Sequence, residues 1–232
     1  MKHFLIGAAA ALSVALAATP ARAQLSDEKP WQGGLARFFF EPRVGALLFA
    51  NKGMRDFYDA GNFYAGLRAG LTLKPGSLVI WPGRRLPGTL SLAAEGGVSW
   101  DKGRDTFPPN EELELLQAPF STGLEWAPFR GREEMLLVPF VGGGFGGSFF
   151  REKAKVTPAL ITDGIRWGWN AEGGVRFLMD YWDRSAARSF ERNEGIRNTW
   201  IGLRGRYQRL RMFDPGLDLS NFTVDLSMQF EM

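Results

Sequence analysis

The residues best suited to chemistry are acids and arginines that recur at alternate positions within apolar segments. The acids are Glu95, Glu125, Glu172 and Asp225, and the bases are Arg68, Arg176, Arg204 and Arg206. Two carboxylates that flank a glycosidic bond suffice to hydrolyse a glycan. The same side chains can instead form buried ion pairs, because an unmatched buried charge costs several kcal/mol. The space around them decides between catalysis and pairing.

Residues that activate nucleophiles or bind transition metals are scarce. The chain has no Cys, and its one His is His3, close to the N-terminus. Catalysis of the Ser-His-acid kind needs an imidazole to accept the hydroxyl proton, and a structural zinc site needs Cys or His ligands. The stretch 142–147 formally matches G-x-G-x-x-G, but no helical pattern follows it, so nucleotide binding is not indicated. We therefore predict no catalytic residues, no metal site and no cofactor.

The N-terminus has the three parts of a secretory signal. Lys2 precedes an apolar stretch over 4–18, Pro20 follows it, and 21–23 reads Ala-Arg-Ala, a small-x-small cleavage site. The apolar stretch is shorter than the roughly 20 residues of a membrane span. We predict a cleaved signal peptide at 1–23 and an N-terminal periplasmic segment at 24–34. Cleavage leaves 26 basic residues against 25 acidic ones, which argues against a nucleic-acid partner.

Beyond residue 34 the sequence alternates between apolar and polar residues. In 63–73 every odd position is apolar, and in 222–232 every even position is apolar. This period-two pattern predicts strands with one apolar and one polar face. The segments that follow it, or resemble it in composition, are 35–50, 63–73, 89–100, 116–126, 135–150, 167–179, 201–208 and 222–232. We predict an all-β domain over 35–232 with about eight antiparallel strands.

A soluble sandwich also alternates, so further features must separate it from a membrane barrel. Several predicted strands reach ten residues, the length of a tilted membrane strand, and their polar faces combine full charges with glycine. Aromatic residues gather near predicted strand ends, as they do at membrane interfaces. These aromatics are Trp100, Trp126, Trp167, Trp169, Tyr181, Trp182 and Trp200. The sequence favours an up-and-down transmembrane β-barrel over the sandwich.

Two glycine-rich segments and the chain's end resemble a known group of proteins. Residues 138–146 read VPFVGGGFG, residues 168–177 read GWNAEGGVRF, and the chain ends inside a predicted strand. Over about 33–232 the chain resembles the small Gram-negative outer-membrane barrels of the OmpA-transmembrane-domain and OmpX-like type. Its last residue, Met232, departs from their usual terminal aromatic. The resemblance implies an outer-membrane location, contact with outer-membrane lipids and assembly by the outer-membrane machinery. Barrel enzymes that process lipids or proteins rely on His, which the processed chain would lack.

An eight-stranded barrel has an interior just wide enough for side chains to fill. We therefore expect the inward acids and arginines to pair across the lumen and close it. This predicts a non-enzymatic barrel with a structural or surface-interaction role and leaves a periplasmic or extracellular partner open. Two alternatives remain: a narrow pore for small solutes, and a lipid- or glycan-modifying enzyme that uses carboxylates.

The expected connections are uneven in length. With the N-terminus in the periplasm, 51–61, 101–113, 151–161 and 211–218 would lie outside the cell. The connections 75–88, 128–134 and 180–198 would face the periplasm, where turns are usually short. Residues 183–192 suit a short helix with Gly195 beyond its end. The sequence favours a plug or spacer here over a docking element.

Overall fold

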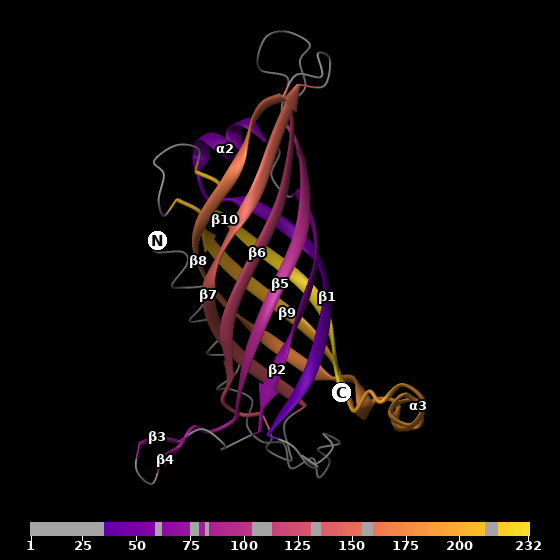
Figure 1. Cartoon of the computed structure of the whole chain (residues 1–232). Helices are drawn as coiled ribbons and strands as arrows, with labels where there is room; N and C mark the ends of the chain where they lie inside the picture. Colours follow the sequence, from indigo (N-terminus) through magenta and orange to yellow (C-terminus); the bar gives the residue numbers. More distant parts are fainter. Residues whose placement is uncertain are drawn as a thin grey trace.

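The computed structural model describes residues 35–58, 62–74, 79–81, 84–103, 113–130, 136–154, 160–211 and 218–232. Eight strands form one closed antiparallel barrel, in which each strand pairs with the next along the chain and the last pairs with the first (Figure 1). The predicted all-β, up-and-down barrel is thus confirmed. The predicted signal peptide at 1–23 and the segment at 24–34 lie outside the described residues.

The barrel strands agree closely with the predicted segments. They are β1 (Ala36–Phe49), β2 (Asn62–Leu73), β5 (Thr89–Lys102), β6 (Leu113–Ala127), β7 (Leu137–Ala154), β8 (Leu160–Leu178), β9 (Asn198–Arg209) and β10 (Asn221–Glu231). We call the end where β1 begins and β10 ends the terminal rim, and the opposite end the far rim. β7 and β8 run further toward the far rim than expected, so the predicted loop at 151–161 is too long.

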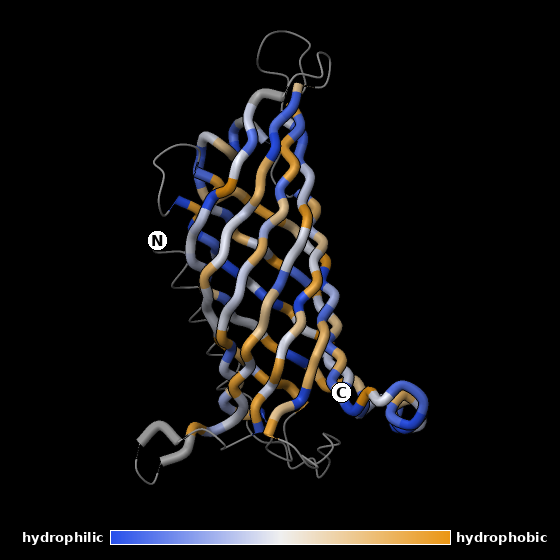
Figure 2. The backbone as a smooth tube through the Cα atoms, in the orientation of Figure 1, coloured by the Kyte–Doolittle hydropathy of each residue, from blue (hydrophilic) through white to orange (hydrophobic). Residues whose placement is uncertain are grey.

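The alternating apolar and polar residues of each strand form the outer and inner faces of the barrel wall. Hydrophilic and hydrophobic residues alternate along each strand in Figure 2. In β2, for example, Leu67 and Leu71 are exposed on the outside, whereas Arg68 and Thr72 are buried in the lumen. The same outward apolar face includes Leu92, Leu124 and Leu226. A belt of exposed leucine, valine and aromatic side chains around a polar interior is typical of a transmembrane barrel.

Smaller elements occupy the connections. α2 (Lys52–Phe57) follows β1, with Asn51 as its N-cap, and a two-stranded pair, β3 (Val79–Trp81) with β4 (Arg84–Arg85), follows β2. The sequence pattern did not predict these elements. A short 3-10 helix, η1 (Met179–Tyr181), leads from β8 toward α3 (Arg184–Glu194). No helix in the described part of the chain is long and apolar enough to cross a membrane.

The boundaries of α3 follow from its caps. One carboxylate oxygen of Asp183 accepts hydrogen bonds from the backbone N–H groups of Ser185, at 3.0 Å, and Ala186, at 2.9 Å. At the other end Gly195 adopts a left-handed conformation, with φ of 71°, which glycine tolerates without steric cost. The predicted helix is therefore confirmed. It lies beside the terminal rim and outside the lumen, so of the predicted plug or spacer the plug is wrong (Figure 1).

The N-cap makes the stability of α3 depend on pH. The backbone hydrogen bond from Ala186 and the hydroxyl of Ser185 lower the pKa of Asp183. Capping is then complete above the pKa of aspartate in an unfolded chain, and it is lost as the pH falls through the lowered folded value. We expect amide protons in the first turn of α3 to lose protection from exchange at acidic pH. Asp183→Asn should keep the cap without this dependence, since asparagine caps without titrating. Equal acid sensitivity of the two proteins in NMR-detected exchange would contradict this role of Asp183.

Candidate functional site

Six charged side chains from five strands meet in the middle of the lumen. We call them the central cluster: Glu41 from β1, Arg68 from β2, Glu125 from β6, Glu172 and Arg176 from β8, and Arg204 from β9. All six side chains are at most 8% exposed. Three carboxylates and three guanidinium groups make the cluster neutral, as burial away from water requires.

Glu125 accepts more hydrogen bonds than the other acids of the central cluster. It accepts hydrogen bonds from Arg68 at 2.7 Å and from Arg176 at 2.7 Å, and Arg204 lies 3.5 Å away. Both oxygens of Glu125 contact Arg176, a two-point geometry that is among the stronger charge-assisted interactions. The Glu125 carboxylate thus joins three arginines from three strands.

The other two acids complete the cluster. Arg204 donates to Glu41 at 2.9 Å and to Glu172 at 2.9 Å. Arg68 lies 3.2 Å from Glu41 and 3.5 Å from Glu172. Each arginine therefore contacts at least two carboxylates, and each carboxylate at least two arginines.

Aromatic rings border the cluster. The guanidinium groups of Arg176 and Arg204 lie over the ring of Phe140, at 4.3 and 4.8 Å from its centre, and Arg68 lies 5.5 Å from the ring of Phe39. Both rings are buried in the lumen. A cation over a ring face gains further electrostatic stabilisation when desolvated.

A second group of charges lies beside the central cluster: Arg43 of β1, Glu95 of β5, Arg206 of β9 and Asp225 of β10. Arg43 donates two hydrogen bonds to Asp225, at 3.0 and 2.6 Å, and one to Glu95 at 2.5 Å. Glu95 also pairs with Arg206. Each charge in this group therefore has a partner of opposite sign, and the two acids and two arginines make the group neutral.

Tyr64 occupies space that two glycines leave open. A Cβ at Gly66 would lie 2.4 Å from the Tyr64 hydroxyl, and a Cβ at Gly97 would lie 2.6 Å from its ring. The ring is buried and lies within 6 Å of both Arg43 and Arg206. Gly66 and Gly97 both face the lumen, and the ring of Tyr64 fills the space that larger side chains would take there.

The lumen is also closed near the terminal rim. Glu231 pairs with Arg130, lies 3.8 Å from Arg37 and accepts a hydrogen bond from Asn198 at 2.9 Å. Arg130 lies 4.8 Å from the ring centre of Trp200. Trp200 is only 1% exposed, so its prediction as an interface aromatic is wrong. Even-numbered residues of β9 face the lumen, and Trp200 shares that face with Arg204 and Arg206.

An apolar cluster closes the lumen near the far rim. It consists of Leu47, Phe49, Met54, Tyr58, Tyr64, Leu115, Phe150, Leu210 and Leu219. Met54 comes from α2, which therefore contributes to this closure. Tyr58 donates a hydrogen bond to Glu152, and burial together with that bond raises the pKa of Tyr58.

The other predicted interface aromatics lie on the outside of the barrel or at its terminal rim. Trp100, Trp167, Trp169 and Trp182 are exposed, whereas Trp126 and Tyr181 are half-buried. Trp126 donates from its indole N–H to the backbone oxygen of Pro87 at 2.9 Å. An apolar body with one satisfied polar atom suits a position between lipid and water.

All eight predicted lumen residues face the interior, in two groups. Arg68, Glu125, Glu172, Arg176 and Arg204 share the central cluster, while Glu95, Arg206 and Asp225 share the second group. Sequence reasoning missed Glu41 and Arg43. The available signal was the odd-numbered phase of Arg37, Glu41 and Arg43, but the inward Phe39, Leu47 and Phe49 obscured the alternation.

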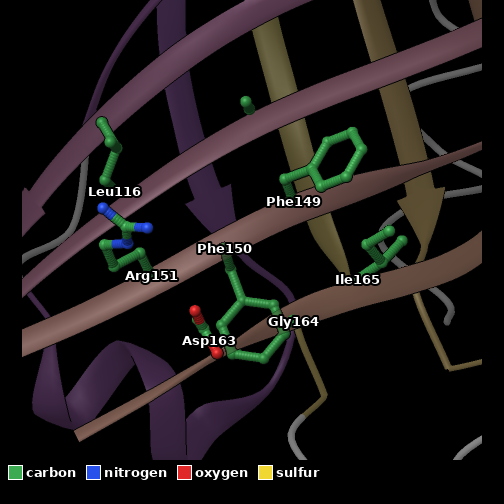
Figure 3. A pocket seen from close by; sticks show the side chains of 8 residues that line it. Leu116, Phe149, Phe150, Arg151, Asp163, Gly164 and Ile165 are labelled. Atoms are coloured by element: carbon green, nitrogen blue, oxygen red, sulfur yellow. The ribbon is translucent and has the colours of Figure 1, made fainter. Parts of the chain in front are cut away.

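One pocket in the described part of the chain lies on the outer wall. It has a volume of about 400 Å³ and is lined by Leu116, Ala118, Phe149, Phe150, Arg151, Asp163, Gly164 and Ile165 (Figure 3). Its lining is largely apolar and contains one carboxylate, that of Asp163. Within the described ranges no group of three metal-ligating side chains is close enough to hold a metal ion.

Of the comparisons with known proteins, the one with solved structures identifies the fold. No protein-family model matches the sequence, and no curated protein matches it. Neisserial surface protein A is a structural match with a TM-score of 0.50 and 11% identity, covering 87% of this chain and 100% of that one. A second match is Ail of Yersinia pestis, in complex with the heparin analogue sucrose octasulfate, with a TM-score of 0.47 and 8% identity over 85% of this chain and 97% of that one. A third is OprG of Pseudomonas aeruginosa, with a TM-score of 0.45 and 10% identity over 85% of this chain and 94% of that one. This chain has the fold of the small outer-membrane barrels.

Proposed function

We propose that this outer-membrane barrel is a closed, non-enzymatic protein with a structural or surface-interaction role. The observation that carries the proposal is the central cluster, in which three acids and three arginines fill the middle of the lumen and neutralise one another. The apolar cluster at the far rim and the Glu231 group at the terminal rim add closures on either side. With its lumen filled, the barrel acts through its rims and its outer wall.

The lumen argues against the alternative of a narrow pore. Ions or small solutes would need to displace buried ion pairs, and each separated pair would leave unmatched charges. We expect purified protein in planar bilayers to show no single-channel steps in 1 M KCl. Steady steps in the parent protein, of a conductance that changes in Arg204→Gln, would assign conduction to this lumen and contradict the proposal. The comparison requires both proteins to migrate as compact, heat-modifiable bands, so that only folded barrels are tested.

The alternative of a carboxylate enzyme receives little support from the geometry. Hydrolysis of a glycoside requires two carboxylates on either side of a bound sugar. The acids of the central cluster are buried and paired with arginines, and the outer pocket offers Asp163 alone. Because fold alone does not determine activity, the test is direct: incubation with lipid A, phospholipid and peptidoglycan fragments should leave each substrate unchanged by mass spectrometry.

The partners that fit this proposal are those of the outer surface. The exposed apolar belt suits the acyl chains of outer-membrane lipids, and the closed antiparallel barrel is the kind of fold that the outer-membrane assembly machinery inserts. A further periplasmic or extracellular partner remains part of the proposal, because the closed lumen leaves the rims as the surfaces available for recognition.

A further inference from the structure

α3 is an amphipathic helix with little protein packed against it. Ala186, Ala187 and Phe190 share one face, whereas Arg184, Arg188 and Arg192 follow one another at four-residue intervals along the other. Within the described part of the chain α3 packs mainly against η1. Ala187 is buried there, but Phe190 remains 48% exposed. Ala186 is half-buried, so Phe190 is the part of the apolar face that the barrel leaves uncovered.

The chain reaches α3 over the outer wall of the barrel. Trp182 packs against Phe177, with ring centres 4.8 Å apart, and Phe177 is an outward residue of β8, in phase with Val175 and Trp169. Trp182 itself is 69% exposed. In Figure 1, α3 lies to one side of the barrel at the terminal rim and is viewed nearly along its own axis, so it runs across the barrel axis. A helix in this position runs parallel to the plane of a surrounding membrane.

We propose that α3 lies in the headgroup layer of the phospholipid leaflet at the terminal rim. Phe190 and Trp182 enter the boundary with the acyl chains, and the arginine stripe of Arg184, Arg188 and Arg192 faces anionic headgroups. Helices that lie on membranes combine a large charged face with a few apolar residues and low overall hydrophobicity. With its N-cap Asp183 the helix has as many acids as arginines, so it is the concentration of Arg184, Arg188 and Arg192 in one stripe that suits an anionic surface.

The proposal rests on the membrane position of the barrel, and one set of measurements can test both. Because the chain lacks cysteine, single thiols can be introduced for spin labelling by Phe190→Cys, Arg188→Cys and, on the lipid-facing wall, Leu67→Cys. The proteins are folded into vesicles of phosphatidylethanolamine and phosphatidylglycerol. Accessibility of each label to oxygen, which concentrates in lipid, is compared with its accessibility to a water-soluble nickel chelate.

We expect the label at position 190 to favour oxygen, as the label at 67 does, and the label at 188 to favour nickel. A lipid-exposed label at 67 with aqueous labels at both 190 and 188 would overturn the helix proposal and leave the membrane barrel intact. An aqueous label at 67 would overturn the membrane barrel itself.

The role of charge has its own control. Combining Arg184→Gln, Arg188→Gln and Arg192→Gln should lower the oxygen-to-nickel ratio at position 190 at least twofold in anionic vesicles. Lys52→Gln with Arg55→Gln, in α2 near the far rim, should leave that ratio unchanged. A triple variant whose ratio equals that of the parent would overturn the assignment of the arginine stripe to anionic headgroups.

Discussion

Replacing Glu125 by glutamine is expected to lower the free energy of unfolding by about 3–5 kcal/mol, the cost of leaving a buried charge unmatched. The substitution keeps the side chain's size but leaves Arg68, Arg176 and Arg204 facing only Glu41 and Glu172. The measurement is urea unfolding of the protein folded into lipid vesicles, with stability taken from the linear dependence on denaturant.

Two further proteins show whether charge matching is the cause. Glu114→Gln changes a half-buried acid of the same strand near the far rim and should alter stability by no more than about 0.5 kcal/mol. Adding Arg176→Met to Glu125→Gln restores equal numbers of acids and bases in the central cluster. The double variant should therefore be more stable than the two single losses predict, by about 1–3 kcal/mol. Simple additivity of the two losses would remove the ion-pair explanation.

Replacing Leu67 by arginine is expected to destabilise the barrel by about 2–4 kcal/mol, the range for arginine on the lipid face at the bilayer midplane. Leu67 is 55% exposed on the outer wall. It lies near the middle of β2, and its register neighbours Pro42 and Gly96 lie near the middles of β1 and β5. Vesicle-based unfolding with urea again provides the measurement.

Leu71 is the matched control on the same face of β2. It lies two residues from the terminal-rim end of the strand, where arginine can reach the headgroups. Leu71→Arg should consequently cost about 0–1 kcal/mol. If Leu67→Arg and Leu71→Arg lowered the free energy of unfolding equally, the strand register would not place Leu67 deeper in the bilayer than Leu71.

The sequence predicts most of the barrel because alternation on a membrane strand is constrained from both sides. Lipid requires apolar residues at positions such as Leu67 and Leu226, and the narrow lumen requires polar or small residues between them. One register satisfies both. The helix at α3 is predictable for a similar reason, since Asp183 and Gly195 mark its two ends.

The central cluster is only partly predictable, because pairing across a lumen depends on strand tilt and stagger. The inward phase of Glu125 and Arg176 can be read from the sequence, but their contact joins residues 51 positions apart. β1 and β7 follow the alternation least well in the sequence. The inward face of β1 mixes the charged Glu41 and Arg43 with two apolar residues. Phe39 lies beside Arg68 of the central cluster, and Leu47 belongs to the apolar cluster near the far rim. Trp200 lies close to a strand end, as interface aromatics do, but the even-numbered phase of β9 turns it into the lumen.

The position of Glu41 and Arg43 on β1 has a consequence for the order of folding. β1 is both the first strand of the barrel and the one that pairs with β10, and Arg43 joins Asp225 across that pairing. The contact spans 182 residues of sequence, so it forms only when the two ends of the sheet meet. Until then Asp225 lacks Arg43 and Arg204 lacks Glu41, although Glu41 can already meet Arg68 on the neighbouring strand β2. A sheet that is fully hydrogen-bonded but still open is therefore disfavoured, and closure and charge neutralisation should occur in one cooperative step.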